Sequence, residues 1–306
     1  MKIQLKQPYS FCQIGKRANQ EDARFPDSDV PCGSDRFFVV CDGVGGQDKG
    51  EVASRTVADA IGDCMSGIDL SDIFTYEDFR KVLDHAFSSL SKQISKETQA
   101  MATTMTFVCF HAGGVFCAHM GDSRIYHIRP GVGILYQSED HSLVNELVHS
   151  GNLTPEEAIG HSRSNVITRC IRHVEKGLER PAATTLQIED VEEGDYFFLC
   201  TDGVLNMIDD GELFSLLSSD ESDKDKIRLI ADKSFGSPDN NTAYLIGIGR
   251  VEDTASRGSV SYKKDYDVNV VDTAPLGSLN MTAIEVIPSV ETTGQKIIRF
   301  FKDLFS

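Results

Sequence analysis

Four short apolar, β-rich runs follow one another between residues 105 and 137. They are Met105–Phe110, Val115–Met120, Arg124–Ile128 and Ile134–Gln137. Parallel strands need a crossover of a dozen or more residues, and the intervals between these runs are too short for one. Several of the runs are therefore expected to pair as antiparallel hairpins, which argues against a doubly wound parallel sheet.

The rest of the chain continues this irregular order of strands and helices. Further strands are expected at Phe37–Cys41, Thr184–Ile188, Tyr196–Cys200 and Ala243–Ile248. Helices are expected at Gly50–Met65 and Tyr76–Gln99, with shorter ones around Ser142–Ser150, Pro155–Gly160, Glu212–Ser218 and Lys224–Ser234. Because strands and helices do not alternate strictly, the sequence predicts an α+β architecture of mostly antiparallel layers.

The overall charge excludes several classes of partner. The 306 residues carry a net charge of −17, and such a chain repels phosphate polymers, so neither nonspecific nucleic-acid binding nor binding to anionic membranes is expected.

The sequence has no run of about 18 apolar residues, and its beginning lacks the apolar core of a signal peptide. The eight cysteines have no CxxC spacing and are expected to be reduced thiols, so a cytoplasmic location without an integral membrane segment is predicted.

The composition changes near residue 250. Residues 1–250 are expected to form the folded part of the chain, whereas 251–306 are polar and weakly periodic. This extension ends in "QKIIRFFKDLFS", where six large apolar side chains share a broad face at helical spacing. We expect a linker followed by a short amphipathic helix, which packs on the preceding domain or docks a partner; binding to a membrane surface is a third alternative, for which the helix is a weak anchor.

Two Asp-Gly pairs end apolar strands. Asp42-Gly43 closes "FFVVCDG" and Asp202-Gly203 closes "YFFLCTDG", whereas the third pair, Asp210-Gly211, has no strand before it and serves as an internal control. Asp-Gly alone usually marks a turn. Carboxylates at the ends of buried strands, however, hold fixed positions and are suited to a site.

Further acidic residues suggest a metal centre. Glu21 and Asp22 follow Arg17 closely, and Asp239 precedes the strand expected at Ala243. Taken singly, these residues are a solvated pair and a turn. Together with the strand-end carboxylates they predict a site for Mg²⁺ or Mn²⁺, which prefer oxygen ligands. Two like charges about 4 Å apart repel by roughly 4 kcal/mol at an effective dielectric of about 20, and divalent cations reverse that sign.

The motifs resemble those of the metal-dependent protein phosphatase family, PP2C, in its bacterial form. The matching stretches, in order, are "RANQEDA" (17–23), "VVCDGVGG" (39–46), "ATTMTFV" (102–108), "AHMGDSRIY" (118–126), "SEDHSLVNELVHSGNLTPEEA" (138–158), "SNVITRCI" (164–171), "FFLCTDGV" (197–204) and "DNNTAYLI" (239–246). They cover nearly all of residues 1–250. The resemblance implies an αββα sandwich with two Mn²⁺ or Mg²⁺ ions between its sheets.

The resemblance also implies roles for individual residues. Asp42 would bridge both ions and the Gly43 carbonyl would bind one; the other ligands would be Asp202, Asp239 and Glu21. Asp22 would orient the attacking water, and Arg17 would bind the phosphate, the alternative for Arg17 being a surface ion pair with Glu21. Asp122 of "GDSR" would bind a third, weaker ion, although the simplest interpretation of that stretch is a hairpin turn.

The implied activity is hydrolysis of phosphoserine and phosphothreonine in proteins by activated water, without a covalent phosphoenzyme. Its substrates would include a serine/threonine kinase, and residues 143–165 would form a flap beside the substrate cleft. Val44 stands where many eukaryotic members have His, so the proton for the leaving group must come from elsewhere. Asp140, His141 and Ser142 either tie down a loop and cap the next helix or take part in catalysis.

Three alternatives compete with an active phosphatase. A noncatalytic member acting as a binding module usually lacks ligands, whereas every ligand position is filled here. A phosphatase that regulates sigma-factor antagonists normally carries sensor or membrane segments, and none is visible. A metal-dependent nuclease fits the carboxylates but neither the net charge nor the order of the motifs. Activity on p-nitrophenyl phosphate with Mn²⁺ separates a phosphatase from a scaffold.

Overall fold

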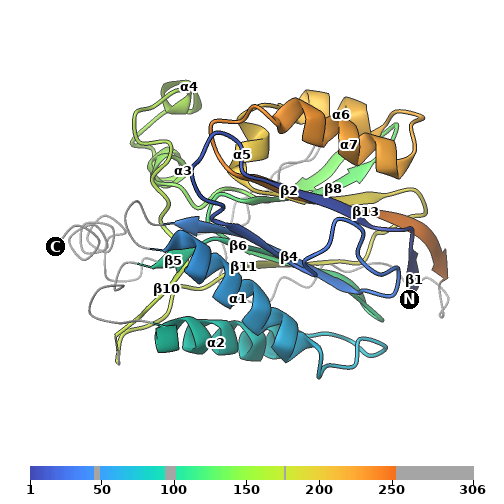
Figure 1. Ribbon diagram of the computed structural model, residues 1–306, viewed down its shortest axis with the longest axis horizontal. Coiled ribbons are helices and arrows are strands. Elements are labelled where there is room, and N and C mark those ends of the chain that lie inside the picture. Colours follow the sequence, from blue (N-terminus) through green and yellow to red (C-terminus); the bar gives the residue numbers. More distant parts are fainter. Residues whose placement is uncertain (45–48, 94–100, 176, 253–306) are drawn as a thin grey trace, which may run out of the picture. The chain divides into compact units, whose positions relative to one another are not determined.

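The computed structural model describes residues 1–252 except 45–48, 94–100 and 176 (Figure 1). The expected C-terminal helix therefore lies outside the described residues. Among the helices that the structure describes, none is long and apolar enough to cross a membrane. All eight cysteines lie in the described part of the chain and are free thiols.

The described strands form two sheets, and every strand pairing in them is antiparallel. The six-stranded sheet contains β1 (Lys2–Leu5), β2 (Tyr9–Gln13), β8 (Arg124–Arg129), β9 (Gly133–Gln137), β12 (Tyr196–Cys200) and β13 (Asn241–Glu252). The seven-stranded sheet contains β3 (Asp22–Phe25), β4 (Phe37–Val44), β5 (Ala102–Thr103), β6 (Met105–His111), β7 (Gly114–Met120), β10 (Ile171–Arg172) and β11 (Thr184–Ile188).

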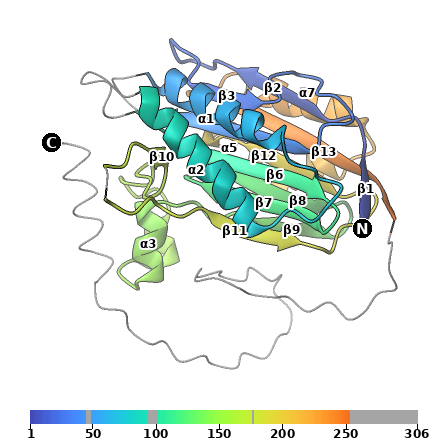
Figure 2. The ribbon, with the colours of Figure 1, turned by 90° about the horizontal axis from the view of Figure 1, so that it is seen from below.

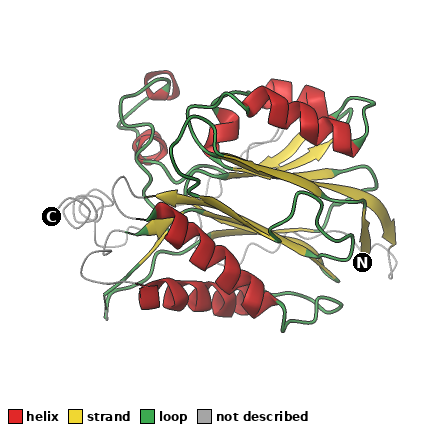
Figure 3. Ribbon diagram, in the orientation of Figure 1, coloured by secondary structure: helices red, strands yellow, loops and turns green. Residues whose placement is uncertain are grey.

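Helices cover the outer faces of both sheets (Figure 3). The helices are α1 (Gly50–Met65), α2 (Tyr76–Gln93), α3 (Leu143–His149), α4 (Pro155–Ala158), α5 (Asp202–Leu205), α6 (Asp210–Leu217) and α7 (Asp223–Ser234). Figure 2 shows α1 and α2 lying across the seven-stranded sheet, and α5 to α7 lie on the six-stranded sheet. The predicted αββα sandwich is thus confirmed.

Three apolar layers hold the sandwich together, and β4 shows how the sequence specifies them. Val39 and Cys41 point into the layer beneath α1 and α2, while Phe38 and Val40 point into the layer between the sheets. Successive side chains of a strand point to opposite faces. Since both faces of β4 are buried, its sequence is a continuous apolar run, and β12 follows the same rule against α5 to α7.

The hairpin predicted for "GDSR" is wrong. β7 belongs to the seven-stranded sheet and β8 to the six-stranded sheet, so Gly121–Ser123 carry the chain from one sheet to the other. Gly121 has a φ of 104°, a conformation that favours glycine. A Cβ on Gly121 would also lie 2.5 Å from Cγ2 of Thr104, so the crossing requires glycine on both counts.

Candidate active site

The first pair of predicted site residues comes from two neighbouring strands of the seven-stranded sheet. Asp22 opens β3, and Asp42 lies near the end of β4. The two residues are directly opposite each other in the antiparallel β3–β4 pair. Residues in that relation share a face of the sheet, so the two carboxylates are close together.

The second pair comes from the six-stranded sheet. Asp202 is the first residue of α5, which begins just after β12, and Asp239 lies two residues before β13. Strands β12 and β13 pair, and Thr201 N–H donates to the carbonyl of Thr242 at 3.0 Å, which continues that pairing to the sheet end. A Cβ on Gly203 would lie 1.8 Å from the carbonyl oxygen of Asn240. The backbones after the two acidic residues therefore meet at a distance that only glycine permits.

Thr201 joins the two sheets at this end. Its hydroxyl donates to Asp22 Oδ2 at 3.0 Å and accepts from the Thr242 amide at 3.0 Å. Asp22 is buried, with only 3% of its surface exposed. A carboxylate of one sheet is thus fixed by a hydroxyl of the other, which brings the two pairs into one cluster.

The main chain at Glu21 is held from both sides. Its carbonyl accepts from Gly43 N–H at 3.0 Å and from the Ser54 hydroxyl at 2.5 Å, and its amide donates to Asn240 Oδ1 at 2.8 Å. A Cβ on Gly43 would lie 2.3 Å from the carbonyl oxygen of Gly50. Each of the two strand-end Asp-Gly pairs thus contains a glycine that close packing requires.

Sequence reasoning missed the role of Asn240. Besides accepting from Glu21, its side-chain amide donates to the carbonyls of Ile14 at 2.8 Å and Asn19 at 2.9 Å. These contacts fix the loop that carries Arg17. The signal was the polar run "DNNT" before β13, but the partners lie more than 200 residues away in the chain.

Asp122 lies on the crossing between the sheets, next to the same cluster. The neighbouring Ser123 hydroxyl lies 2.8 Å from the Thr104 hydroxyl, which accepts from Asp42 N–H at 2.9 Å. Thr103 donates to the Asp42 carbonyl at 2.8 Å. The "ATT" stretch therefore links the turn of Asp122 to the strand that carries Asp42.

The carboxyl groups resist ionisation. Burial, reinforced by repulsion from neighbouring carboxylates, raises the pKa of Asp22 to about 8, that of Asp122 to about 7 and that of Asp202 to about 6. The pKa of Asp42 is raised well above its ordinary value, first by burial and then by repulsion from Asp22 and Asp202. Without cations, protons partly neutralise this cluster.

The donor set fits a hard divalent cation. Carboxylate oxygens and a backbone carbonyl are the ligands that Mg²⁺ and Mn²⁺ prefer. Asp22 Oδ1 and Asp202 Oδ1 are buried and have no hydrogen-bond partner among the described residues. Within the same residues, no three His, Cys, Asp or Glu side chains are already gathered closely enough to hold an ion. An ion bound at this cluster would therefore have to draw the carboxylates closer together.

Arg17 stands at the edge of the cluster. Its Nη2 donates to Asp239 Oδ2 at 2.6 Å, and half of its side chain is exposed. The alternative expected for Arg17 is an ion pair with Glu21. The structure shows an ion pair with Asp239 instead. An exposed guanidinium beside the cluster can exchange Asp239 for a phosphate group, because both offer two oxygens to its planar fork.

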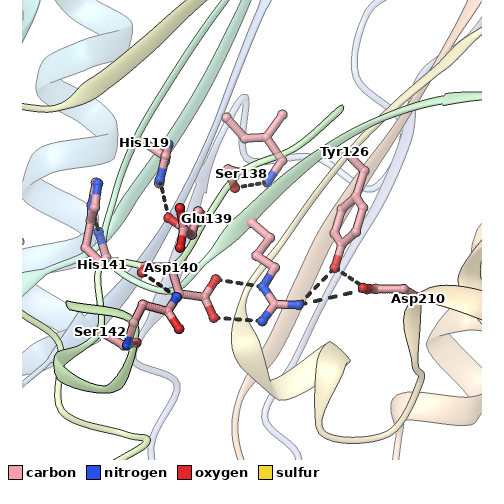
Figure 4. A network of polar contacts seen from close by, with 12 residues as sticks. His119, Tyr126, Ser138, Glu139, Asp140, His141, Ser142 and Asp210 are labelled. Carbon is pink, nitrogen blue, oxygen red and sulfur yellow. Dashed lines mark hydrogen bonds and ion pairs between the residues drawn. The ribbon is translucent and has the colours of Figure 1, made fainter. Parts of the chain in front are cut away.

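The structural role proposed for Asp140, His141 and Ser142 is confirmed (Figure 4). The Ser142 hydroxyl caps α3 by accepting from Asn145 N–H at 3.2 Å, and Asp140 accepts two hydrogen bonds from Arg124, at 2.6 and 2.7 Å.

The third Asp-Gly pair behaves differently from the other two. Asp210 accepts from the Tyr126 hydroxyl at 2.8 Å, and a Cβ on Gly211 would have Asp209 Oδ1 as its nearest neighbour, at 3.3 Å. Close packing therefore does not impose glycine at this position, as expected for the internal control.

Comparisons with known proteins agree on one family. The family model described as protein phosphatase 2C matches residues 14–221. The protein phosphatase PhpP of Streptococcus pneumoniae is 31% identical over 240 residues, which cover 76% of this chain and 93% of PhpP. The crystal structure of serine/threonine phosphatase Stp1 from Staphylococcus aureus is similar with a TM-score of 0.68 and 28% identity, covering 81% of this chain and 97% of that one.

A further solved structure contains metal. It is the catalytic domain of the serine/threonine protein phosphatase PstP in complex with two manganese ions. The similarity has a TM-score of 0.64 and 25% identity, and it covers 80% of this chain and 99% of the other.

Proposed function

Since the chain belongs to the protein phosphatase 2C family and is a serine/threonine protein phosphatase, we propose that it removes phosphate at the carboxylate cluster where the two sheets end. The solved structure of PstP holds two manganese ions, which supports a metal centre in this chain, and we place that centre at the same cluster. The proposed ligands of two Mn²⁺ or Mg²⁺ ions are Glu21, Asp42, the Gly43 carbonyl, Asp202 and Asp239, with Asp122 for a third, weaker ion.

One observation supports this proposal most strongly. Two buried carboxylate oxygens, on Asp22 and Asp202, lack a hydrogen-bond partner among the described residues, inside a cluster that already repels its own charge. Unsatisfied buried acceptors are costly unless a cation or a donor reaches them. Bound divalent cations would neutralise this charge and lower the pKa of water, so that a nucleophile is available near neutral pH.

The protein side chains then have separate tasks. Arg17 would hold two phosphate oxygens in a fixed orientation. Asp22, whose Oδ2 is held by Thr201, would orient the attacking water with Oδ1. Val44 has no proton to give, so the oxygen of the leaving serine or threonine takes its proton from water or from a carboxyl group.

Metal binding is expected to stabilise the protein most at alkaline pH. In the metal-free protein the pKa values of Asp22, Asp122 and Asp202 lie above the value of about 3.9 of an unfolded chain. The stability that these raised values contribute is complete below pH 4 and is lost as the pH rises through 6 to 8. The melting temperature in EDTA should therefore fall between pH 5 and pH 8, and saturating Mn²⁺ should raise it more at pH 8 than at pH 5.

Thermal melting with EDTA or Mn²⁺ at both pH values, together with phosphate release from a phosphothreonine peptide, tests this expectation. The Asp202→Asn variant should show a smaller Mn²⁺-induced shift. A melting temperature that neither EDTA nor Mn²⁺ changes, together with no Mn²⁺-dependent phosphate release, would contradict the proposed metal centre. It would favour a noncatalytic member of the family.

The Arg17→Ala variant should separate phosphate binding from metal binding. A hydrogen bond to a charged group contributes about 1.5–3 kcal/mol, so kcat/KM for a phosphopeptide should fall by about 10- to 100-fold, mainly through KM. Mn²⁺ affinity, measured by calorimetry, should stay near that of the wild type. The matched control is Arg80→Ala, which removes an exposed arginine that pairs with Glu77 on α2. A loss of Mn²⁺ affinity in Arg17→Ala would show that Arg17 has a structural role instead.

Several finer expectations stay predictions. They are the inclusion of a serine/threonine kinase among the substrates, the flap at 143–165, the domain boundary near 250, the docking of a partner by residues 251–306 and the cytoplasmic location.

A further inference from the structure

Residues 138–142 run beside the crossing that carries Asp122. Ser138 N–H donates to the Ile125 carbonyl at 2.9 Å, and Ile125 N–H donates to the Ser138 hydroxyl at 2.9 Å. Figure 4 shows Ser138 to Ser142 in succession, with His119 beside Glu139 and His141. The segment therefore follows the turn along its whole length before the chain enters α3.

His141 holds Gly121 by two hydrogen bonds. Its amide donates to the Gly121 carbonyl at 2.9 Å, and the Gly121 amide donates to His141 Nδ1 at 3.2 Å. Because a backbone N–H can only donate, Nδ1 must be the acceptor and the ring proton must lie on Nε2. Nε2 then donates to the Thr184 hydroxyl at 2.8 Å. The ring is used at both nitrogens, which fixes its orientation.

His119 supports the ring of His141 from one side. The two rings are stacked, with centroids 4.5 Å apart and planes 8° from parallel. His119 Nε2 donates to the Glu139 carbonyl at 2.8 Å, so the segment is tied to β7 as well. Burial lowers the pKa of both histidines, to about 4 for His119 and about 2 for His141, so both rings are neutral near pH 7.

Asp140 holds the other end of the same turn. It accepts from Arg124 Nε at 2.6 Å and from Nη2 at 2.7 Å. This is the two-point geometry that a planar guanidinium makes best, and Arg124 is about three-quarters buried. Gly121 and Arg124 flank Asp122 and Ser123. The turn is therefore hydrogen-bonded on both sides, to His141 and to Asp140.

The same segment forms the base of the expected flap. Thr168 N–H donates to the His141 carbonyl at 2.8 Å, and Leu143 N–H donates to the Val166 carbonyl at 2.8 Å. Both ends of residues 143–165 are thus attached where His141 lies. His141 therefore contacts both Gly121 and the base of the expected flap.

We propose that His141, assisted by Asp140, is a positioning residue for Asp122. His141 fixes the main chain at Gly121, which determines where the carboxylate of Asp122 lies, and it connects this turn to the base of the flap. The inference rests on the proposed function, because the position of Asp122 matters for activity only if the cluster binds divalent cations. Mutation of a residue that orients a metal ligand typically lowers metal affinity or activity by about 10- to 100-fold.

Two substitutions of His141 test the role of its acceptor atom. His141→Leu keeps an apolar side chain but has no acceptor, whereas His141→Asn places Oδ1 close to where Nδ1 lies. His111→Leu is the matched control, because His111 is also a buried histidine whose Nδ1 accepts backbone amides, from Phe74 at 3.0 Å and Gly113 at 3.1 Å. It lies at the end of β6, and the hydrogen-bond partners of its ring among the described residues are Phe74, Gly113 and Gln187.

The full chain is titrated with Mn²⁺ by calorimetry, and the Mn²⁺ concentration for half-maximal activity on p-nitrophenyl phosphate is measured. Hydrogen exchange over residues 119–124 is followed in EDTA. His141→Leu should weaken the Asp122-dependent part of Mn²⁺ binding by about tenfold or more and speed exchange, and His141→Asn should restore most of both. His111→Leu should lower the melting temperature without changing Mn²⁺ binding.

Several results would overturn the proposal. The first is a Mn²⁺ titration of His141→Leu that matches that of the wild type or of His111→Leu. The second is a failure of His141→Asn to restore Mn²⁺ binding. If His141→Leu does not fold, Arg124→Lys, which keeps the charge but loses the two-point contact, must give the same weakening. A wild type without Mn²⁺-dependent activity would count against the proposed function, whereas exchange in EDTA tests the link between His141 and Gly121 independently.

Discussion

Replacing Asp42 with alanine is expected to lower kcat/KM on a phosphopeptide by several orders of magnitude. Asp42 faces the other carboxylates: burial raises its pKa first, and repulsion from Asp22, Asp202, Asp122 and Asp239 raises it further. A residue in that position can serve two cations at once. Its loss removes charge from both, and calorimetry should show weaker Mn²⁺ binding with fewer ions bound.

The same variant should not be less stable than the wild type when metal is absent. At pH 8 the wild type carries the mutual repulsion of the cluster, and Asp42→Ala removes part of it. The melting temperature in EDTA should therefore be equal or higher, which separates loss of a ligand from loss of the fold. Near-normal turnover in Asp42→Ala would rule out a bridging role, and Asp84→Ala, an exposed carboxylate on α2 that pairs with Arg180, serves as the control.

The second large effect is expected from a single methyl group. Gly203→Ala would place a Cβ 1.8 Å from the Asn240 carbonyl oxygen, a distance that no relaxation of side chains can relieve. The segment from Asp239 to Asn240 must then move away from α5, which would disrupt the ion site that we propose for Asp202 and Asp239. We expect activity to fall by at least about a hundredfold, together with a lower melting temperature.

The matched control is Gly211→Ala in the third Asp-Gly pair. Gly211 lies in the first turn of α6, and its added Cβ would have Asp209 Oδ1 as its nearest neighbour, at 3.3 Å. In a helix, alanine is favoured over glycine by roughly 0.5–1 kcal/mol, so stability should stay the same or rise slightly and activity should not change. Equal effects of Gly203→Ala and Gly211→Ala would contradict the close approach as the reason for glycine.

The sequence predicts the long elements well because their physical causes are local. β11, β12 and α1 occur with the predicted bounds. β12 is buried on both faces and is apolar throughout, whereas β11 is half-buried and rich in β-branched residues. α1 repeats its apolar residues every three or four positions. The structure adds short strands that the sequence does not reveal. β5 and β10 have two residues each, and β3 has four, which is too few for a periodic pattern.

The candidate site was predicted in part for the same reason. The carboxylates Asp42, near the end of β4, and Asp202, just after β12, follow apolar runs and are visible in the sequence, as is the match to a known family. The partners that fix them are not, because Thr201 and Asp22 are 179 residues apart and Asn240 and Glu21 are 219 apart. The sheet membership of β8 was missed because the chain distance between two strands does not show whether they pair.

The position of β13 has a consequence for biosynthesis. This strand is the last of the described strands in the chain, yet it pairs with β12 on one edge and with both β1 and β2 on the other. The first strands to be made therefore have no lasting partner until the last one emerges, roughly 10 to 50 s later at about 5–20 residues per second. During that time their unpaired edges are open to wrong pairing, so a ribosome that stalls before residue 241 leaves a chain with neither Asp239 in place nor a completed sheet.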